Sequence, residues 1–94
     1  MQTSVVELAA GFSLRSRVDR MDYLAGRAIA KAGRVTVVTA EPERVELTVA
    51  DGDVHTVVLR RDGAALAATC TCSTLPVCRH AVAAEHVLWL QAKR

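Results

Sequence analysis

Apolar residues recur with a helical period early in the chain. At about 100° per residue, several of them between residues 17 and 32 fall on one broad face. These residues are Val18, Met21, Leu24, Ala25, Ala28, Ile29 and Ala32. Ser16 is a candidate N-cap, and Gly33 stands where a left-handed C-terminal cap is expected. The pattern predicts an amphipathic helix over roughly residues 17–32.

After this helix the period changes to that of a β-strand. The runs are rich in Val and Thr, and polar residues alternate with apolar ones in the second run. The expected strands are Val35–Ala40, 45–49, 53–60 and 64–69. The dipeptides Asp51-Gly52 and Asp62-Gly63 favour tight hairpin turns between them. The pattern therefore predicts an antiparallel meander of three or four strands.

The first turn also predicts a register. If Asp51 and Gly52 are the two loop residues, one apolar face results. The facing pairs are then Val49 with Val54, Leu47 with Thr56 and Val45 with Val58. In this register His55 lies on the polar face, opposite Thr48.

The two ends of the chain give different signals. From Cys78 to about Gln91, apolar residues recur at helical spacing, which predicts a C-terminal helix. Ser4 and Glu7 form a capping-box pattern, but residues 3–11 fit a short helix or a strand equally well. We therefore expect an α+β fold, with an N-terminal segment at 1–16 and one domain at 17–94.

Composition limits the core that such a chain can build. The sequence has 94 residues and is 51% hydrophobic, but only 3% aromatic. Domains of this size often need a staple such as a metal ion. Of the few aromatic residues, Trp89 either packs on the sheet or anchors a partner.

Charge and hydropathy limit the partners and the cellular location that we expect. The net charge of +2 does not by itself indicate a nucleic-acid binder. The sequence contains no apolar run of the roughly 20 residues that cross a bilayer, and its start does not resemble a signal peptide. We expect a cytoplasmic protein without a membrane partner.

Three cysteines and a histidine gather in one short segment. Cys70 and Cys72 are two residues apart, and Cys78 and His80 repeat that spacing. Thiolate and imidazole are the donors that zinc prefers, four at a time. In a reducing compartment such a group indicates a metal site rather than disulfides. A nucleophilic Cys78–His80 pair lacks an accompanying acid in the sequence.

The segment resembles the SWIM-type zinc finger, with Cys-x-Cys, a spacer at 73–77, Cys-x-His and then an apolar helix. The resemblance extends over roughly residues 17–90. Its upstream parts are Gly26-Arg27, Gly33-Arg34-Val35 and Glu41-Pro42-x-Arg44-Val45. It implies one zinc ion bound by Cys70, Cys72, Cys78 and His80. It also implies a role in binding DNA or protein. From the closed set of ligands we expect this ion to clamp the last strand to the last helix.

Four protein donors would close the metal's coordination shell, so we expect a structural metal and no enzymatic activity. His86 would replace a ligand only if His80 pointed away. The favoured function is an interaction module for an unidentified protein partner. The alternative is DNA binding through a basic helix face, which could also be an ordinary solvated face. The residues of that basic face are Arg20, Arg27, Lys31 and Arg34.

Overall fold

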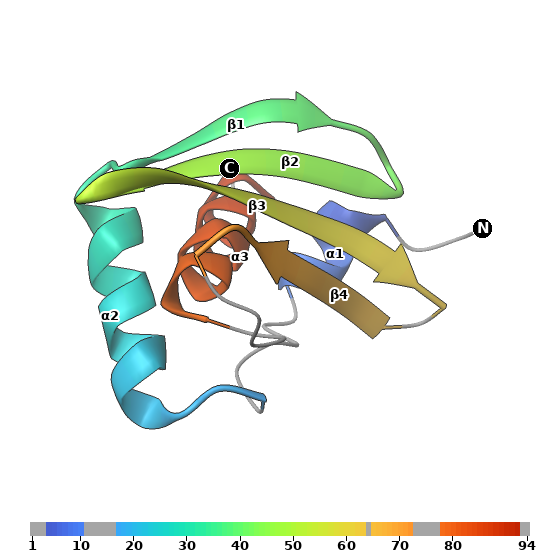
Figure 1. Cartoon of the computed structure of the whole chain (residues 1–94). Coiled ribbons are helices and arrows are strands. Elements are labelled where there is room, and N and C mark those ends of the chain that lie inside the picture. Colours follow the sequence, from blue (N-terminus) through green and yellow to red (C-terminus); the bar gives the residue numbers. More distant parts are fainter. Residues whose placement is uncertain (1–3, 11–16, 64, 73–77, 93–94) are drawn as a thin grey trace.

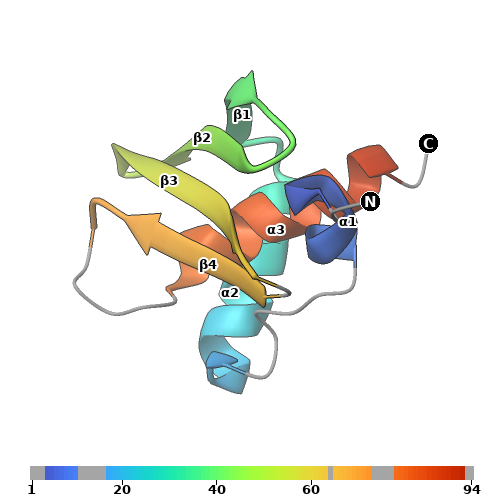
Figure 2. The ribbon, with the colours of Figure 1, turned by 90° about the vertical axis from the view of Figure 1, so that its right-hand side faces the viewer.

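A four-stranded antiparallel sheet covers three helices in the computed structural model, which describes residues 4–10, 17–63, 65–72 and 78–92. The elements are α1 (Val5–Ala10), α2 (Arg20–Lys31), β1 (Val35–Ala40), β2 (Arg44–Asp51), β3 (Asp53–Asp62), β4 (Ala65–Cys70) and α3 (Arg79–Ala92). The strands follow one another in the order β1-β2-β3-β4. All helices lie on one side of the sheet, with α3 between α1 and α2 (Figures 1 and 2). The predicted α+β fold is confirmed.

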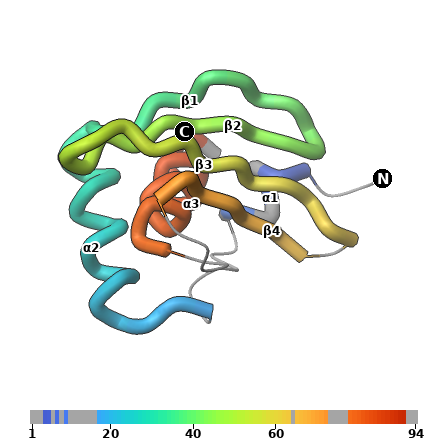
Figure 3. The backbone as a smooth tube through the Cα atoms, in the orientation of Figure 1, coloured from blue at the N-terminus to red at the C-terminus, as the bar shows by residue number. Residues whose placement is uncertain are grey.

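Helix α3 forms the centre of the core. Every residue from His80 to His86 is buried, and Leu88 is only 1% exposed. The sheet contributes fully buried side chains opposite this helix, namely Val45, Leu47, Val49, Val57, Leu59 and Leu66. The tube in Figure 3 follows the chain from α2 through the meander and back to α3. Because α3 is covered by the sheet and by both other helices, its many alanines fit a position where little room is left on any side.

The hairpin between β2 and β3 has a different register from the expected one. Asp51 pairs with Asp53, so the pairs shift by one residue. Val45 then faces Leu59, and Leu47 faces Val57. Side chains opposite each other in a sheet share a face, so this shift places apolar partners together in the core. It leaves Val54 outside, 70% exposed, where the predicted register had it facing Val49.

The N-terminal helix α1 settles the choice between helix and strand for residues 5–10. The backbone amide of Glu7 donates to Ser4 Oγ, and the Ser4 amide donates to the Glu7 carboxylate. This reciprocal pair is the predicted capping box. Val5 and Ala9 are fully buried, and the Val5 amide donates to the carbonyl of Pro42 at 2.7 Å. Helix α1 is therefore attached to the core as well as to the β1–β2 turn.

Helix α2 begins and ends at clear caps. Asp19, not the predicted Ser16, is the N-cap, and its side chain accepts from the Asp22 amide at 2.9 Å; Ser16 itself lies outside the described residues. Gly33, with φ of 73°, ends the helix as predicted. Its amide donates to Ala30, and the Arg34 amide donates to Ile29. These two bonds make a Schellman motif.

The buried face of α2 is rotated from the predicted one. Met21 is 76% exposed and Leu24 is 44% exposed, although both were expected in the core. The side that meets α3 instead carries Gly26, Ile29 and Ala30. A Cβ atom built on Gly26 would lie 2.6 Å from Val82 Cβ and 2.7 Å from the carbonyl oxygen of Arg79. Close approach of the two helices at this glycine therefore decides which face is buried.

We predict that Gly26→Ala destabilises the protein, by about 1–3 kcal/mol of unfolding free energy, because the added methyl meets backbone that cannot move aside. Alanine is the better helix former by about 1 kcal/mol, so intrinsic propensity alone would give the opposite sign. Ala28→Gly, at an exposed site on the same helix, is the matched control and should lose about 1 kcal/mol from propensity. Denaturant unfolding of both variants measures this, and a stabilised Gly26→Ala protein would refute the close packing.

Candidate metal centre

Four side chains converge where the last strand gives way to the last helix. Cys70, Cys72, Cys78 and His80 each offer one donor atom, and these atoms all lie within 4.8 Å of one another. Cys78 and His80 are buried, whereas Cys72 is exposed. The group therefore lies at the edge of the core, and its members can together hold a metal ion.

The donor atoms lie about as close together as they would around a single metal ion. Cys72 Sγ lies 3.3 Å from Cys70 Sγ and 3.6 Å from Cys78 Sγ. His80 Nδ1 lies 3.0 Å from Cys72 Sγ and 3.6 Å from Cys70 Sγ. At the usual zinc bond lengths, the edges of a tetrahedron would be about 3.8 Å between sulfurs and about 3.5 Å between nitrogen and sulfur. The four donors are thus already gathered at close to ligand spacing.

Backbone contacts on both sides hold the donors in place. Cys70 is the last residue of β4, and beyond it the Thr71 amide donates to the Thr56 carbonyl at 3.1 Å. The Thr56 amide donates in turn to Thr71 Oγ1. On the other side, the Val82 amide donates to the carbonyl of Cys78 at 3.2 Å, at the start of α3. The connection at 73–77, with Pro76, lies outside the described residues.

The orientation of His80 depends on a residue that sequence reasoning missed. Its Nδ1 faces the thiols, and its Nε2 lies 2.8 Å from Asp51 Oδ2. This arrangement assigns the proton to Nε2, which donates to Asp51, and leaves Nδ1 free to bind an ion. The hydrogen bond from His80 also holds the pKa of Asp51 below its usual value. Asp51 was expected only to form a turn, and nothing in the sequence links it to a histidine so far along the chain.

His55 is a second neighbour that the predicted register misplaced. It pairs with the fully buried Val49, so it points to the inner face of the sheet and not to the polar face. Its ring stacks on that of His80, with centroids 4.3 Å apart and planes 15° from parallel. His80 is therefore held on one edge by Asp51 and on one face by His55.

Two of the three thiols, Cys70 and Cys72, lie in surroundings that favour the protonated form. Burial raises the pKa of Cys70 to about 12, and burial also raises the pKa of Cys72. A metal ion would displace these protons when it binds.

His86 and Trp89 lie on α3, apart from this group of donors. The two rings stack with centroids 5.4 Å apart, and His86 is only 5% exposed. Burial lowers the pKa of His86, and the charges of Arg27 and Lys31 lower it further. Because His80 points to the thiols, His86 is not required as a substitute ligand.

The predicted basic face is spread along the outside of α2. Arg20 and Lys31 are exposed on the helix, and Arg34 is exposed just beyond its cap. Arg27 is half-buried, with its guanidinium carbon 5.9 Å from the centre of the Tyr23 ring. Part of this face therefore has a packing role.

Comparisons with known protein families, with curated proteins and with solved structures give no match. Among the described residues, no helix is both long enough and apolar enough to cross a bilayer.

Because Asp51 fixes the ring of His80, we predict that Asp51→Asn lowers metal affinity by about 10- to 100-fold. Competition with a chromophoric chelator measures the affinity. Asp53→Asn is the matched control: it removes an exposed carboxylate from the partner position across the same turn. Equal affinities for the two variants would mean that the Asp51–His80 contact does not orient the ligand.

Proposed function

We propose that this chain is a small zinc-stapled, SWIM-like interaction module that acts by binding a protein partner. The observation that carries the proposal is the closed set of three thiols and one imidazole, within 4.8 Å of one another. Tetrahedral sites of sulfur and nitrogen donors are characteristic of zinc. Cys70, Cys72, Cys78 and His80 would hold the ion, which would supply binding energy to the folded state.

The position of the donors supports a structural role. Cys70 ends β4 and His80 lies in the first turn of α3, so one ion would tie the sheet to the central helix. Four protein donors leave no coordination position for water, which a catalytic zinc needs. On this proposal the module is not an enzyme.

The SWIM-like character rests on the order of parts. The chain runs from an amphipathic helix through a meander to Cys-x-Cys, a spacer, Cys-x-His and a helix. Gly26 and Gly33, which belong to the upstream resemblance, have structural roles here: one allows helix contact and the other ends α2. These roles give a physical reason for glycine at both places.

The presence of zinc and its proposed structural role between β4 and α3 can be tested together. We predict one zinc ion per purified chain by elemental analysis. His80→Gln should abolish metal retention and lower the helical signal in circular dichroism, because metal-binding energy is folding energy in small sites. His86→Gln, on the same helix but outside the donor group, is the control and should keep its zinc.

Cys72→Ser extends the test to an exposed ligand, where the loss of core packing is small. If Cys72→Ser and His80→Gln both retain a full equivalent of zinc, the assignment fails.

DNA binding is the second candidate, since Arg20 and Lys31 are exposed on α2 and Arg34 is exposed just beyond its cap. If the protein-binding proposal is right, a labelled duplex should show no shift at low salt. Contacts to several phosphates would instead give tight binding that falls steeply as salt increases. Such a slope, reduced in Arg20→Ser and Lys31→Ser but not in Arg60→Ser on the sheet, would favour the DNA function.

A further inference from the structure

The outer face of α2 combines exposed apolar side chains with positive charge. Met21 and Leu24 are 76% and 44% exposed, and Ala28 is exposed one turn further along. Their spacing of i, i+3 and i+7 places them on one line along the helix. Exposed large apolar residues clustered at one place mark a site of interaction more often than isolated ones do.

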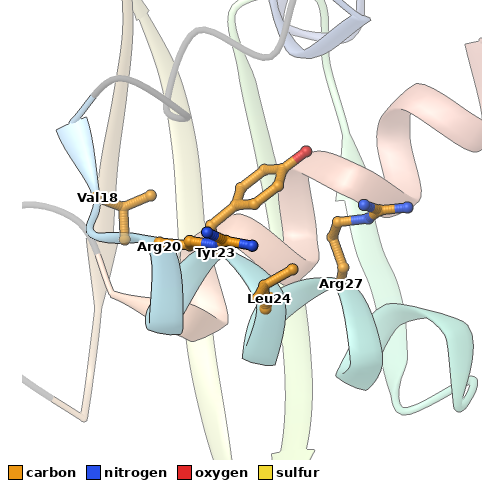
Figure 4. Close-up of a pocket in the computed structure, with 5 residues that line it drawn as sticks. All are labelled: Val18, Arg20, Tyr23, Leu24 and Arg27. Carbon is orange, nitrogen blue, oxygen red and sulfur yellow. The ribbon is translucent and has the colours of Figure 1, made fainter.

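A hollow of about 530 Å³ lies beside this line. The described residues that line it are Val18, Arg20, Tyr23, Leu24 and Arg27, all shown in Figure 4. The lining therefore combines apolar side chains with two arginine side chains. A ligand that fills this hollow would need apolar groups together with negative charge.

The charges extend beyond the hollow. Lys31 adds a positive charge in the last turn of α2, and Arg34 lies beyond the cap, near Ala28 and Ala32; both basic residues are exposed. The exposed charges of Arg20, Lys31 and Arg34 favour an acidic ligand.

The apolar line distinguishes a peptide from a nucleic acid. Contacts to phosphates need Arg and Lys but gain nothing from an exposed Met21 or Leu24. Burial of these side chains against a partner's apolar residues would contribute to binding, and methionine adapts well to such surfaces.

We propose that the outer face of α2 is a docking site for an acidic amphipathic helix of a partner protein. This inference rests on the proposed protein-binding function and names its surface and the chemistry of its partner. Apolar side chains of the partner pack on Met21 and Leu24, and one of them enters the hollow. Carboxylates of the partner meet Arg20 and Arg27, which are seven residues or about 10 Å apart along α2. Acidic residues seven apart on the partner helix match that distance.

The test uses the zinc-loaded 94-residue chain and a fluorescent peptide of about 20 residues, long enough to form a helix. The peptide carries Leu at i, i+3 and i+7 and Glu at flanking positions seven apart. A peptide of the same composition in scrambled order is the reference. Fluorescence anisotropy should show that the patterned peptide binds at least tenfold more tightly than the scrambled one. If the two peptides bind equally well, charge attraction alone explains the binding and the proposal is overturned.

Two pairs of variants locate the contact. Leu24→Glu should weaken binding at least tenfold, whereas Val54→Glu, at a 70% exposed site on the outer face of the sheet, should leave it within twofold. Arg20→Glu should weaken it similarly, with Arg60→Glu, exposed on β3, as the charge control. All four sites are at least partly exposed, and circular dichroism and zinc content check that each variant is folded. Similar losses in test and control variants would overturn the proposal.

The remaining outcomes separate this inference from the proposed function. If a protein partner binds the unmodified chain and Leu24→Glu with the same affinity, the module still binds protein, but this surface is excluded as the docking site. If a DNA duplex competes with the patterned peptide, and Leu24→Glu abolishes binding of the duplex, the face would be a nucleic-acid site and the proposal would be overturned. Self-association of the protein that Leu24→Glu abolishes would assign it to a second copy, with the same result.

Discussion

The burial of α3 between the sheet and two other helices is the constraint that organises this molecule. A helix can be surrounded in this way only if its neighbours come close, and small side chains on α3 allow that. Gly26 provides the matching surface on α2, where even a methyl group would meet Val82 and the Arg79 backbone. With α3 fixed at the centre, its first turn is brought to the end of β4, and His80 meets the cysteines.

The candidate metal centre also depends on the central position of α3. Four donors from one short segment need not converge, because each pair could point elsewhere. They converge because β4, paired with β3, places Cys70, while Cys78 lies directly before α3 and His80 lies in its first turn. The β2–β3 hairpin then adds Asp51 to the edge of His80 and His55 to its face. A site that looks local in the sequence is thus completed by a turn from another part of the sheet.

The orientation of α2 on the core decides which of its side chains are available for the proposed function. Since Gly26, Ile29 and Ala30 face α3, Met21 and Leu24 must face outward, next to Arg20 and Arg27. The same packing that stabilises the fold therefore creates an apolar and basic surface. On the proposal that the metal is structural, four protein donors would leave it no open position, and a surface of this kind would be where a partner binds.

The sequence by itself determined the features that depend on neighbours along the chain. Periods of about 3.6 and two residues located the α2 and α3 helices and the strands, and Gly33 marked the end of α2. Ser4 with Glu7 gave a capping-box pattern, but helix and strand both stayed open for residues 3–11. The four donors were identifiable because their i, i+2 spacing is a local property. Only the tertiary structure decided the register of β2 with β3, the buried face of α2, and the roles of Asp51 and His55. Each of these depends on contacts between residues far apart in the chain, where a shift of one residue or a rotation of one helix changes the partner without changing the local pattern.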